Sequence, residues 1–255
     1  MVIKILFNFF LSRMQIYMSK TPLHLAAQKG RKSTVELLLN CNADVHIQDE
    51  NEQTALHLAA CEGHQETVNL LLRHKVNVNM IDKDKQTALH LASKKGHLST
   101  VQLLLIYNAD VDVKDKNEQT ALHLTVPNPF MGFVDEEPQI AKLLLEHNAD
   151  IHAKDKNEQT ILHLATEAGH QDIVELLLQC KADMHVQDKH GKTPLHLAAN
   201  KGNQILTELF LQHNANMHIK DKEGHTALDL ARSRKYQYIV GAFEHHVKKY
   251  AHSQR

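Results

Sequence analysis

The chain has 255 residues, and its 29 Lys and Arg nearly balance its 30 Asp and Glu, for a formal net charge of −1 at pH 7. This balance argues against a protein that binds nucleic acid through bulk electrostatics, which needs net positive charge or a basic stripe. Aromatic residues are scarce at 5% and Trp is absent, which favours a thin layered structure of Leu and Ala over one large core. The three cysteines are too few for a disulfide framework, so we expect a reducing compartment, the cytoplasm or the nucleus, rather than secretion.

The first 20 residues form an apolar segment with three open interpretations. Residues 1–18 read MVIKILFNFFLSRMQIYM and carry only Lys4 and Arg13 as charges. The segment could be a cap or truncated repeat packed on the adjoining part of the chain, a non-native start to a chain that begins near Met14 or Met18 or in a longer protein, or a signal or anchor. It has no clear cleavage site and is short and interrupted for a membrane span. We therefore expect no membrane attachment unless this segment anchors the chain.

A five-residue string, Thr-x-Leu-His-Leu, recurs along the rest of the sequence. Its copies begin at Thr21, Thr54, Thr87, Thr120, Thr160 and Thr193, and a seventh copy at Thr226 carries Asp229 in place of the histidine. Successive copies are 33 residues apart, except for one spacing of 40. Self-similarity at a fixed period predicts a solenoid of stacked repeats.

Within one repeat, residues 87–119, the pattern predicts two short helices. Thr87 stands where it can cap the first helix, whose buried face includes Leu89. Gly96 ends that helix, and a second apolar stripe around Leu104 marks the next one. Neither helix is long enough to be stable alone, so each repeat must stack on its neighbours.

The motif TPLHLAA, followed by Gly-His, a V-x-LLL run and NADV, resembles the ankyrin repeat in both period and wording. The resemblance implies an all-α ankyrin-repeat solenoid of helix-turn-helix units with β-hairpin-like loops. It covers residues 21–249 and leaves 250–255 as a short polar tail. In this family the hairpin tips and inner helices form a concave face that binds proteins, so the resemblance implies the same face here.

The fourth repeat departs from the pattern. Its prolines at 127, 129 and 138 forbid a continuous first helix, so we expect a long loop between the two helices. The loop carries apolar residues beside acids, which suggests either a contact site or a loop folded onto its own repeat. The candidate contact residues are Phe130, Met131, Phe133, Asp135, Glu136 and Glu137.

The hairpin tips depart from the pattern as well. The family usually has Gly two residues before the motif Thr, as at Gly191 and Gly224, but four other tips have Glu or Lys there. We expect those turns to relax or to place Asn51, Asp84, Asn117 or Asn157 at positive φ. The resulting charged tips begin with Asp49, Glu50 and Glu52, and the candidate binding residues among the later tips are Lys83, Lys85, Lys116, Glu118, Lys156 and Glu158.

The histidines invite a metal or catalytic interpretation, which their spacing argues against. We assign a structural role to the motif pairs, in which the ring bridges successive repeats: His24, then Thr54, His57, Thr87, His90, Thr120, His123, Thr160, His163, Thr193 and His196. A second row, at His46, His152, His185 and His218, has rungs about 8–10 Å apart, too far to share an ion whose ligands lie about 2 Å away.

No phosphate loop, zinc motif or nucleophile elbow occurs in the sequence, and we expect no catalytic residue, cofactor or metal. The favoured function is a monomeric, non-enzymatic adaptor that binds another protein. The alternative is a fragment of a larger membrane-associated or secreted protein, of channel or toxin type. The seventh repeat, with Lys235 in place of the usual Gly and a basic stretch from Glu244 to Lys249, is interpreted as a C-terminal cap.

Overall fold

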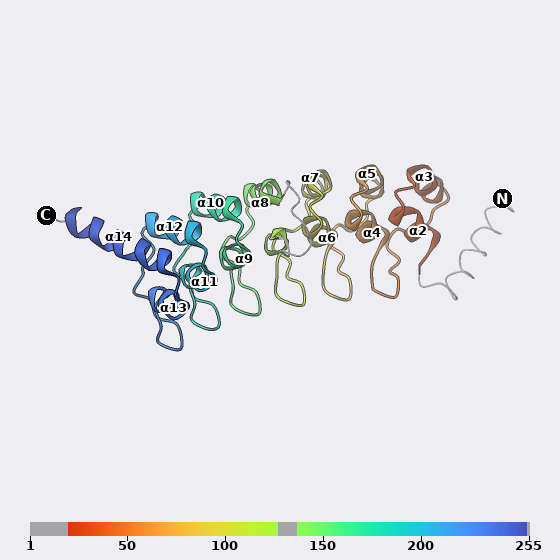
Figure 1. Cartoon of the computed structure of the whole chain (residues 1–255). Helices are drawn as coiled ribbons and strands as arrows, with labels where there is room; N and C mark the ends of the chain where they lie inside the picture. The colour runs from red at the N-terminus through yellow and green to blue at the C-terminus, as the bar shows by residue number, and fades with distance from the viewer. Residues whose placement is uncertain (1–19, 127–136, 254–255) are drawn as a thin grey trace. The chain divides into compact units, whose positions relative to one another are not determined.

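The computed structural model describes residues 20–126 and 137–253 (Figure 1). The chain divides into two compact units, which we describe separately: unit 1 lies within Met1–Thr125 and Val134–Ala149, and unit 2 within Val126–Phe133 and Asp150–Arg255. The described residues form α-helices and one short 3-10 helix, without a strand. The fold is therefore the predicted all-α repeat solenoid.

Unit 1 is built from pairs of short antiparallel helices. Its inner helices are α2 (Pro22–Gln28), α4 (Ala55–Cys61) and α6 (Ala88–Lys94), and its outer helices are α3 (Lys32–Asn40), α5 (Gln65–Arg73), α7 (Leu98–Ile106) and α8 (Glu137–Glu146). Inner helices pack on inner helices and outer on outer, so that α4 lies between α2 and α6. The hairpins extend from the inner helices on the side away from the outer ones (Figure 1).

Unit 2 repeats the same design. Its inner helices are α9 (Ile161–Ala168), α11 (Pro194–Lys201) and α13 (Ala227–Ser233), and its outer helices are α10 (Gln171–Gln179), α12 (Gln204–Gln212) and α14 (Gln237–Ser253). The last helix buries Ile239 and Phe243 and continues to Ser253, into the stretch from 250 onward that we predicted to be a polar tail.

The core of each unit is a thin layer between the inner and outer rows. Leu56 and Leu71 in unit 1 and Ile173 and Phe210 in unit 2 are almost completely buried. Alanines such as Ala59 are also completely buried, because a small side chain lets neighbouring helices approach closely. This Leu and Ala layer explains how the chain folds with so few aromatic residues.

The fourth repeat lacks a regular inner helix. Where the other repeats have two turns of α-helix, it has the 3-10 helix η1 (His123–Thr125), and the next helix, α8, begins at Glu137. The loss of the inner helix agrees with the proline-based prediction. The predicted contact loop runs from Pro127 to Pro138, and its residues 127–136 lie outside the described residues, as does the apolar segment of residues 1–19. Across the described residues, no helix combines the length and the apolar character needed to cross a bilayer.

Candidate functional site

Five motif histidines link the start of their own inner helix to the hairpin that comes next in the chain: His24, His57, His90, His163 and His196. In the third repeat, the amide of Thr87 donates to Nδ1 of His90 (3.2 Å), and the amide of His90 donates to Oγ1 of Thr87 (3.4 Å). Because Nδ1 accepts, the ring proton lies on Nε2, which donates to the carbonyl of Gln119 (3.2 Å). The pair forms a capping box, which satisfies amides at the helix N-terminus that would otherwise be unpaired.

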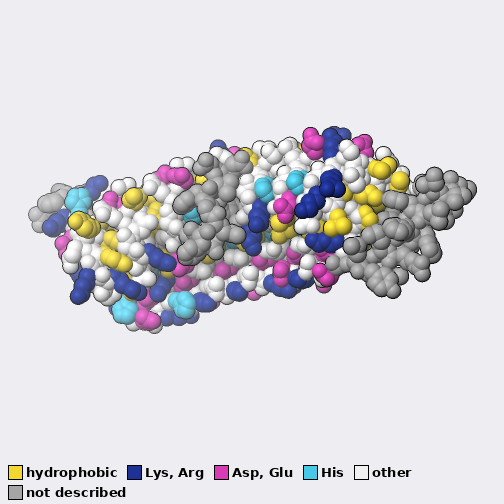
Figure 2. Space-filling model, turned by 45° about the vertical axis from the view of Figure 1, so that its right-hand side comes forward, with side chains coloured by type: hydrophobic (Ala, Val, Ile, Leu, Met, Phe, Trp, Pro, Cys, Tyr) yellow, Lys and Arg dark blue, Asp and Glu magenta, His cyan; other side chains and the backbone are white. Residues whose placement is uncertain are grey.

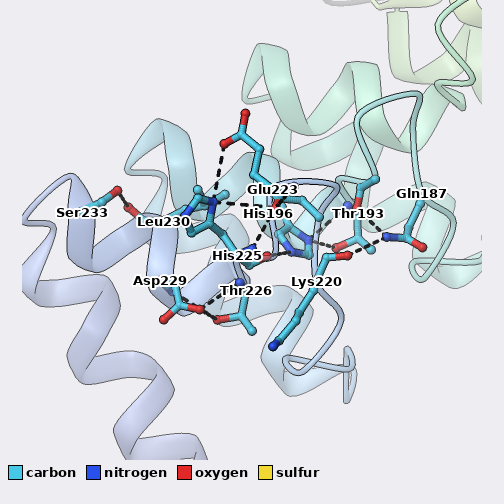
Figure 3. Close-up of polar contacts among 12 residues, drawn as sticks. Gln187, Thr193, His196, Lys220, Glu223, His225, Thr226, Asp229, Leu230 and Ser233 are labelled. Atoms are coloured by element: carbon cyan, nitrogen blue, oxygen red, sulfur yellow. Dashed lines mark hydrogen bonds and ion pairs between the residues drawn. The ribbon is translucent and has the colours of Figure 1, made fainter.

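The same ring-to-carbonyl contact recurs within each unit. Its other instances are His24 to Gln53 (2.9 Å) and His57 to Gln86 (3.1 Å) in unit 1, and His163 to Lys192 (3.1 Å) and His196 to His225 (3.2 Å) in unit 2 (Figure 3). His123 keeps the bond from the amide of Thr120 (3.2 Å) even though its helix is shortened. The five rings that contact a carbonyl thus join successive repeats.

The last repeat shows why its motif residue is Asp229. Its carboxylate accepts from the amide (3.0 Å) and hydroxyl (2.7 Å) of Thr226, and so performs the capping half of the histidine's role (Figure 3). These hydrogen bonds lower the pKa of Asp229.

Burial lowers the pKa of five motif histidines below the ordinary value of 6.5, because desolvation penalises the charged ring. The five are His24, His57, His90, His163 and His196. The carbonyl that each ring faces and a nearby aspartate offset only part of this effect. The rings are therefore neutral in the folded stack at physiological pH.

A buried aspartate organises each hairpin. Oδ1 of Asp115 accepts from the amides of Asn117 (2.7 Å) and Gln119 (3.0 Å), while Oδ2 accepts from Nε2 of Gln86 in the preceding repeat (3.4 Å). The same Oδ1 turn is made by Asp49, Asp82, Asp155, Asp188 and Asp221. Our expectation that Asp49 belongs to an exposed tip was wrong, because its side chain is needed inside the turn and is only 7% exposed.

In the hairpin tips that lack glycine, the residue with positive φ is not the one we expected. The residues that stand in place of glycine themselves adopt the left-handed conformation: Glu52 (φ 58°), Lys85 (58°), Glu118 (60°) and Glu158 (59°). The neighbouring Asn and Asp residues do not, so that expectation was wrong. The aspartate fixes the amides on both sides of the tip residue, and those two bonds impose positive φ on whichever residue lies between them.

Replacing Glu118 with Gly should raise the free energy of unfolding by about 0.5–1 kcal/mol. Glycine removes the cost of the left-handed conformation, and its greater freedom in the unfolded chain offsets part of the gain. Chemical denaturation of Glu118→Gly and wild type measures the difference. The reverse change at Gly191 is the control: a Cβ there would lie 2.8 Å from the amide nitrogen of Lys222, so Gly191→Ala should destabilise the chain. A destabilised Glu118→Gly variant would contradict this account.

Neighbouring hairpins are joined at their tips. The amide of Lys83 donates to the carbonyl of Asn51 (3.0 Å), and its Nζ donates to Oδ1 of the same residue. The amide of Lys116 likewise donates to the carbonyl of Asp84 (2.9 Å), with Nζ 3.1 Å from Oδ1. The side chains of Lys83 and Lys116, two of the predicted binding residues, therefore help to align the hairpins.

The other predicted tip residues, Lys85, Glu118, Lys156 and Glu158, are exposed. Those of the loop, Phe130, Met131, Phe133, Asp135 and Glu136, lie outside the described residues, and Glu137 is described only as the first residue of α8. The structure therefore brings the candidate residues together only as rows of hairpin tips, within each unit.

A further histidine role escaped the sequence analysis. Nε2 of His64 lies 3.1 Å from the carbonyl of Gln28, and Nε2 of His97 lies 3.0 Å from that of Cys61, both near the end of the preceding inner helix. The His97 ring covers Gly63, where a Cβ would be 2.6 Å from Nδ1. The two residues of the Gly-His dipeptide therefore act between repeats: the glycine of one repeat leaves room for the histidine of the next repeat. Its recurrence at the repeat period was the available signal.

The histidines of the second row are exposed. Nε2 of His185 accepts from the amide of Asn216 (3.1 Å), so that lone pair is already used. The group with metal-ligand geometry among the described residues is Asp221, Glu223 and His225. Nδ1 of His225 lies 3.5 Å from Oε2 of Glu223 (Figure 3). Oδ1 of Asp221 accepts two amides of its turn, as in every other hairpin, so this group is a variant of the tip.

Comparison with known proteins gives a consistent result. The family described as Ankyrin repeats (3 copies) matches residues 23–115, 105–188 and 178–243. The human ASB11 ankyrin repeat domain superposes with a TM-score of 0.76 at 26% identity, covering 88% of this chain and 98% of that one. The ankyrin repeat domain of Bcl-3, a unique member of the IkappaB protein family, gives 0.75 at 30% identity, covering 87% and 98%. No curated protein matches the sequence.

Proposed function

The chain belongs to the ankyrin repeat family, a general protein–protein interaction fold, and on that premise we propose that it is a non-enzymatic adaptor that binds a protein partner through the concave face of its inner helices and hairpin tips. The observation that carries this proposal is a difference between the repeat positions that stabilise the stack and those that are exposed to solvent. The positions that hold the stack together are nearly constant, whereas two exposed positions change charge between successive repeats of unit 1. These are the ends of the inner helices (Lys29, Glu62 and Lys95) and the tips (Glu52, Lys85 and Glu118).

The constant positions are the motif Thr, the motif His and the hairpin Asp, whose hydrogen bonds join the helices to the hairpins. The varied positions include the exposed C-caps of the inner helices of unit 1, which are Lys29, Glu62 and Lys95. In unit 2, Lys201 and Arg234 occupy the same repeat position, and both are exposed. Basic and acidic side chains are interspersed over the face of the described residues that Figure 2 shows. Such variation on a constant framework supports recognition of one partner's pattern of charge.

The framework also lowers the cost of binding. The caps, turns and tip contacts hold the backbone of both the inner helices and the hairpins before any partner arrives, so little ordering entropy is lost on association. Mixed charges then provide specificity, because a mismatched partner places like charges together. The loop residues from Phe130 to Glu137 remain part of the proposal as an additional contact.

We place this activity in a single copy of the chain in the cytoplasm or the nucleus. The cysteines support a reducing compartment: Cys41, Cys61 and Cys180 are all free thiols. Burial raises the pKa of the Cys61 thiol, which keeps it protonated and unreactive.

Affinity purification from native cells with the whole chain, followed by titration of the captured protein, tests the proposal. The variant Lys85→Glu with Lys95→Glu reverses charge on a tip and an inner helix, and should weaken binding about tenfold, or ~1.4 kcal/mol. The matched control, Arg73→Glu, reverses an exposed charge on outer helix α5 and should change the affinity less than about twofold. If the folded chain captures no saturable partner, or if Arg73→Glu weakens binding equally, the proposal is wrong.

A further inference from the structure

We propose that the apolar segment of residues 1–18 packs against an open face of α2 and α3 and closes unit 1 at that end. We define the open face by the residues Thr21, Pro22, Leu25, Thr34 and Leu37. It is distinct from the concave face of the proposed adaptor function, and the inference does not depend on that function.

The inner-helix part of the open face is recognised by comparing equivalent positions in successive repeats. Leu25 of α2 is 42% exposed, whereas its equivalents Leu58 and Leu91 are 5% and 8% exposed. Pro22 is partly exposed, whereas Ala55 at the equivalent position is buried. Since α4 packs on α2 and α6 packs on α4, these positions are covered by the preceding repeat wherever one is present.

The outer helix shows the same contrast. Thr34 of α3 is exposed, whereas Thr67 and Thr100 are each 1% exposed at the equivalent positions of α5 and α7. Leu37 is 61% exposed, whereas Leu70 at the equivalent position of α5 is only partly exposed. Apolar side chains accordingly gather at the end of unit 1 that holds α2 and α3, toward the right of Figure 2. Both helices of the first repeat thus present a surface shaped to be covered.

Residues 1–18 have the composition and the reach to cover it. They carry only two charges, Lys4 and Arg13, and many large apolar side chains. They are joined through Ser19 and Lys20 directly to Thr21, the N-cap of α2, so the covering segment starts beside the face. As a helix, 18 residues would be about 27 Å long, roughly twice the length of the 9-residue α3. Terminal repeats of a solenoid need such a cap, because they otherwise present a core-facing surface to water.

Hydrogen exchange on the full-length chain, read by mass spectrometry, tests this packing. We expect the amides of residues 2–18 to be protected about tenfold or more over random-coil rates, since docking removes them from free exchange. Leu37→Glu places a charge in the open face and should abolish that protection. The matched control is Ile106→Glu, which changes an equally exposed residue (69%) of outer helix α7 away from the open face and should leave the protection intact.

A thermal double-mutant cycle supplies a second measurement. Leu37→Glu and the pair Leu6→Asp with Phe10→Asp should each lower the Tm of the full-length chain by about 3 °C, and their combination should lower it by no more than either alone. Additive losses would overturn the proposal. So would random-coil exchange in residues 2–18, which a signal, an anchor or a non-native start would give, or protection that survives Leu37→Glu. Sedimentation velocity should show a monomer, since a dimer would mean that the face is covered by a second copy.

Discussion

Lowering the pH from 7.5 to 5.5 should markedly reduce the free energy of unfolding of this chain. Five buried motif histidines have a pKa lowered by desolvation in the folded state, while in the unfolded chain each returns to about 6.5. Below pH 6.5 the unfolded chain therefore binds more protons than the folded one, so acid favours unfolding. The stabilisation is complete above pH 6.5 and is lost progressively as the pH falls toward the folded-state pKa.

The size of the effect depends on the number of groups. Each histidine that is charged in the unfolded chain and neutral in the stack contributes a slope of at most about 1.4 kcal/mol per pH unit. Five such groups act in the same direction. Protonation would also turn Nδ1 from an acceptor into a donor, and so would break the bond from the amide of the motif Thr. Urea unfolding followed by circular dichroism at several pH values measures the slope.

One substitution in unit 1 isolates the contribution of a single buried histidine. His57→Gln removes one buried titrating ring and should make the dependence of stability on pH shallower than in the wild-type chain. Coincident unfolding curves at pH 7.5 and 5.5 in the wild-type chain would show that the rings are not held neutral in the stack.

The second large effect concerns the hairpin aspartates. Asp115→Ala should lower the free energy of unfolding by about 3 kcal/mol, since it removes the acceptor of two backbone amides in a turn that water scarcely reaches. It also removes the acceptor of the Gln86 side chain and so weakens the link to the preceding repeat. Chemical denaturation of the full-length chain measures the loss.

Asp115→Asn is the matched control for this prediction. The amide oxygen of asparagine keeps the position and the accepting role of Oδ1, so we expect a loss of about 1 kcal/mol or less. An alanine variant as stable as the asparagine variant would mean that the tip is held by contacts other than the carboxylate.

The architecture of each repeat could be predicted from the sequence because its signals are local. Three signals each act within a few residues: a threonine before an apolar run, a glycine after the first helix such as Gly96, and a stripe of leucines in the second helix. The 33-residue period then multiplies a weak signal into a strong one, and both helices of the repeat were found where expected. The interruption in the fourth repeat was equally local, since proline prevents a helix by itself.

The hairpins could not be predicted in the same way. Local preference alone assigns positive φ to Asn51 or Asn117, yet Glu52 and Glu118 adopt it. The decisive contacts span the turn, from the aspartate to the amides two and four residues later. Gly191 and Gly224 occupy the same repeat position as Glu52 and Glu118, and glycine at that position already indicated where positive φ is needed. The error lay in treating each tip by itself rather than by its position in the repeat.

The candidate site was predicted only in part, for a related reason. The sequence identified rows of charged tips but could not show that Lys83 and Lys116 bond to the preceding hairpin, because those partners are 32 residues away. Nor could it show that His97 covers Gly63 of the preceding repeat, since that contact depends on how two repeats stack.

By itself, then, the sequence determined the period, the helix pairs, the caps and the broken fourth repeat, because each depends on interactions within one repeat. Only the tertiary structure decided which carbonyl the Nε2 of a motif histidine meets and which lysines are already engaged. Those contacts join atoms of different repeats, and the repeated motif is the same on both sides of each junction. The stacking geometry, rather than the motif, therefore determines which side chains are left to meet a partner.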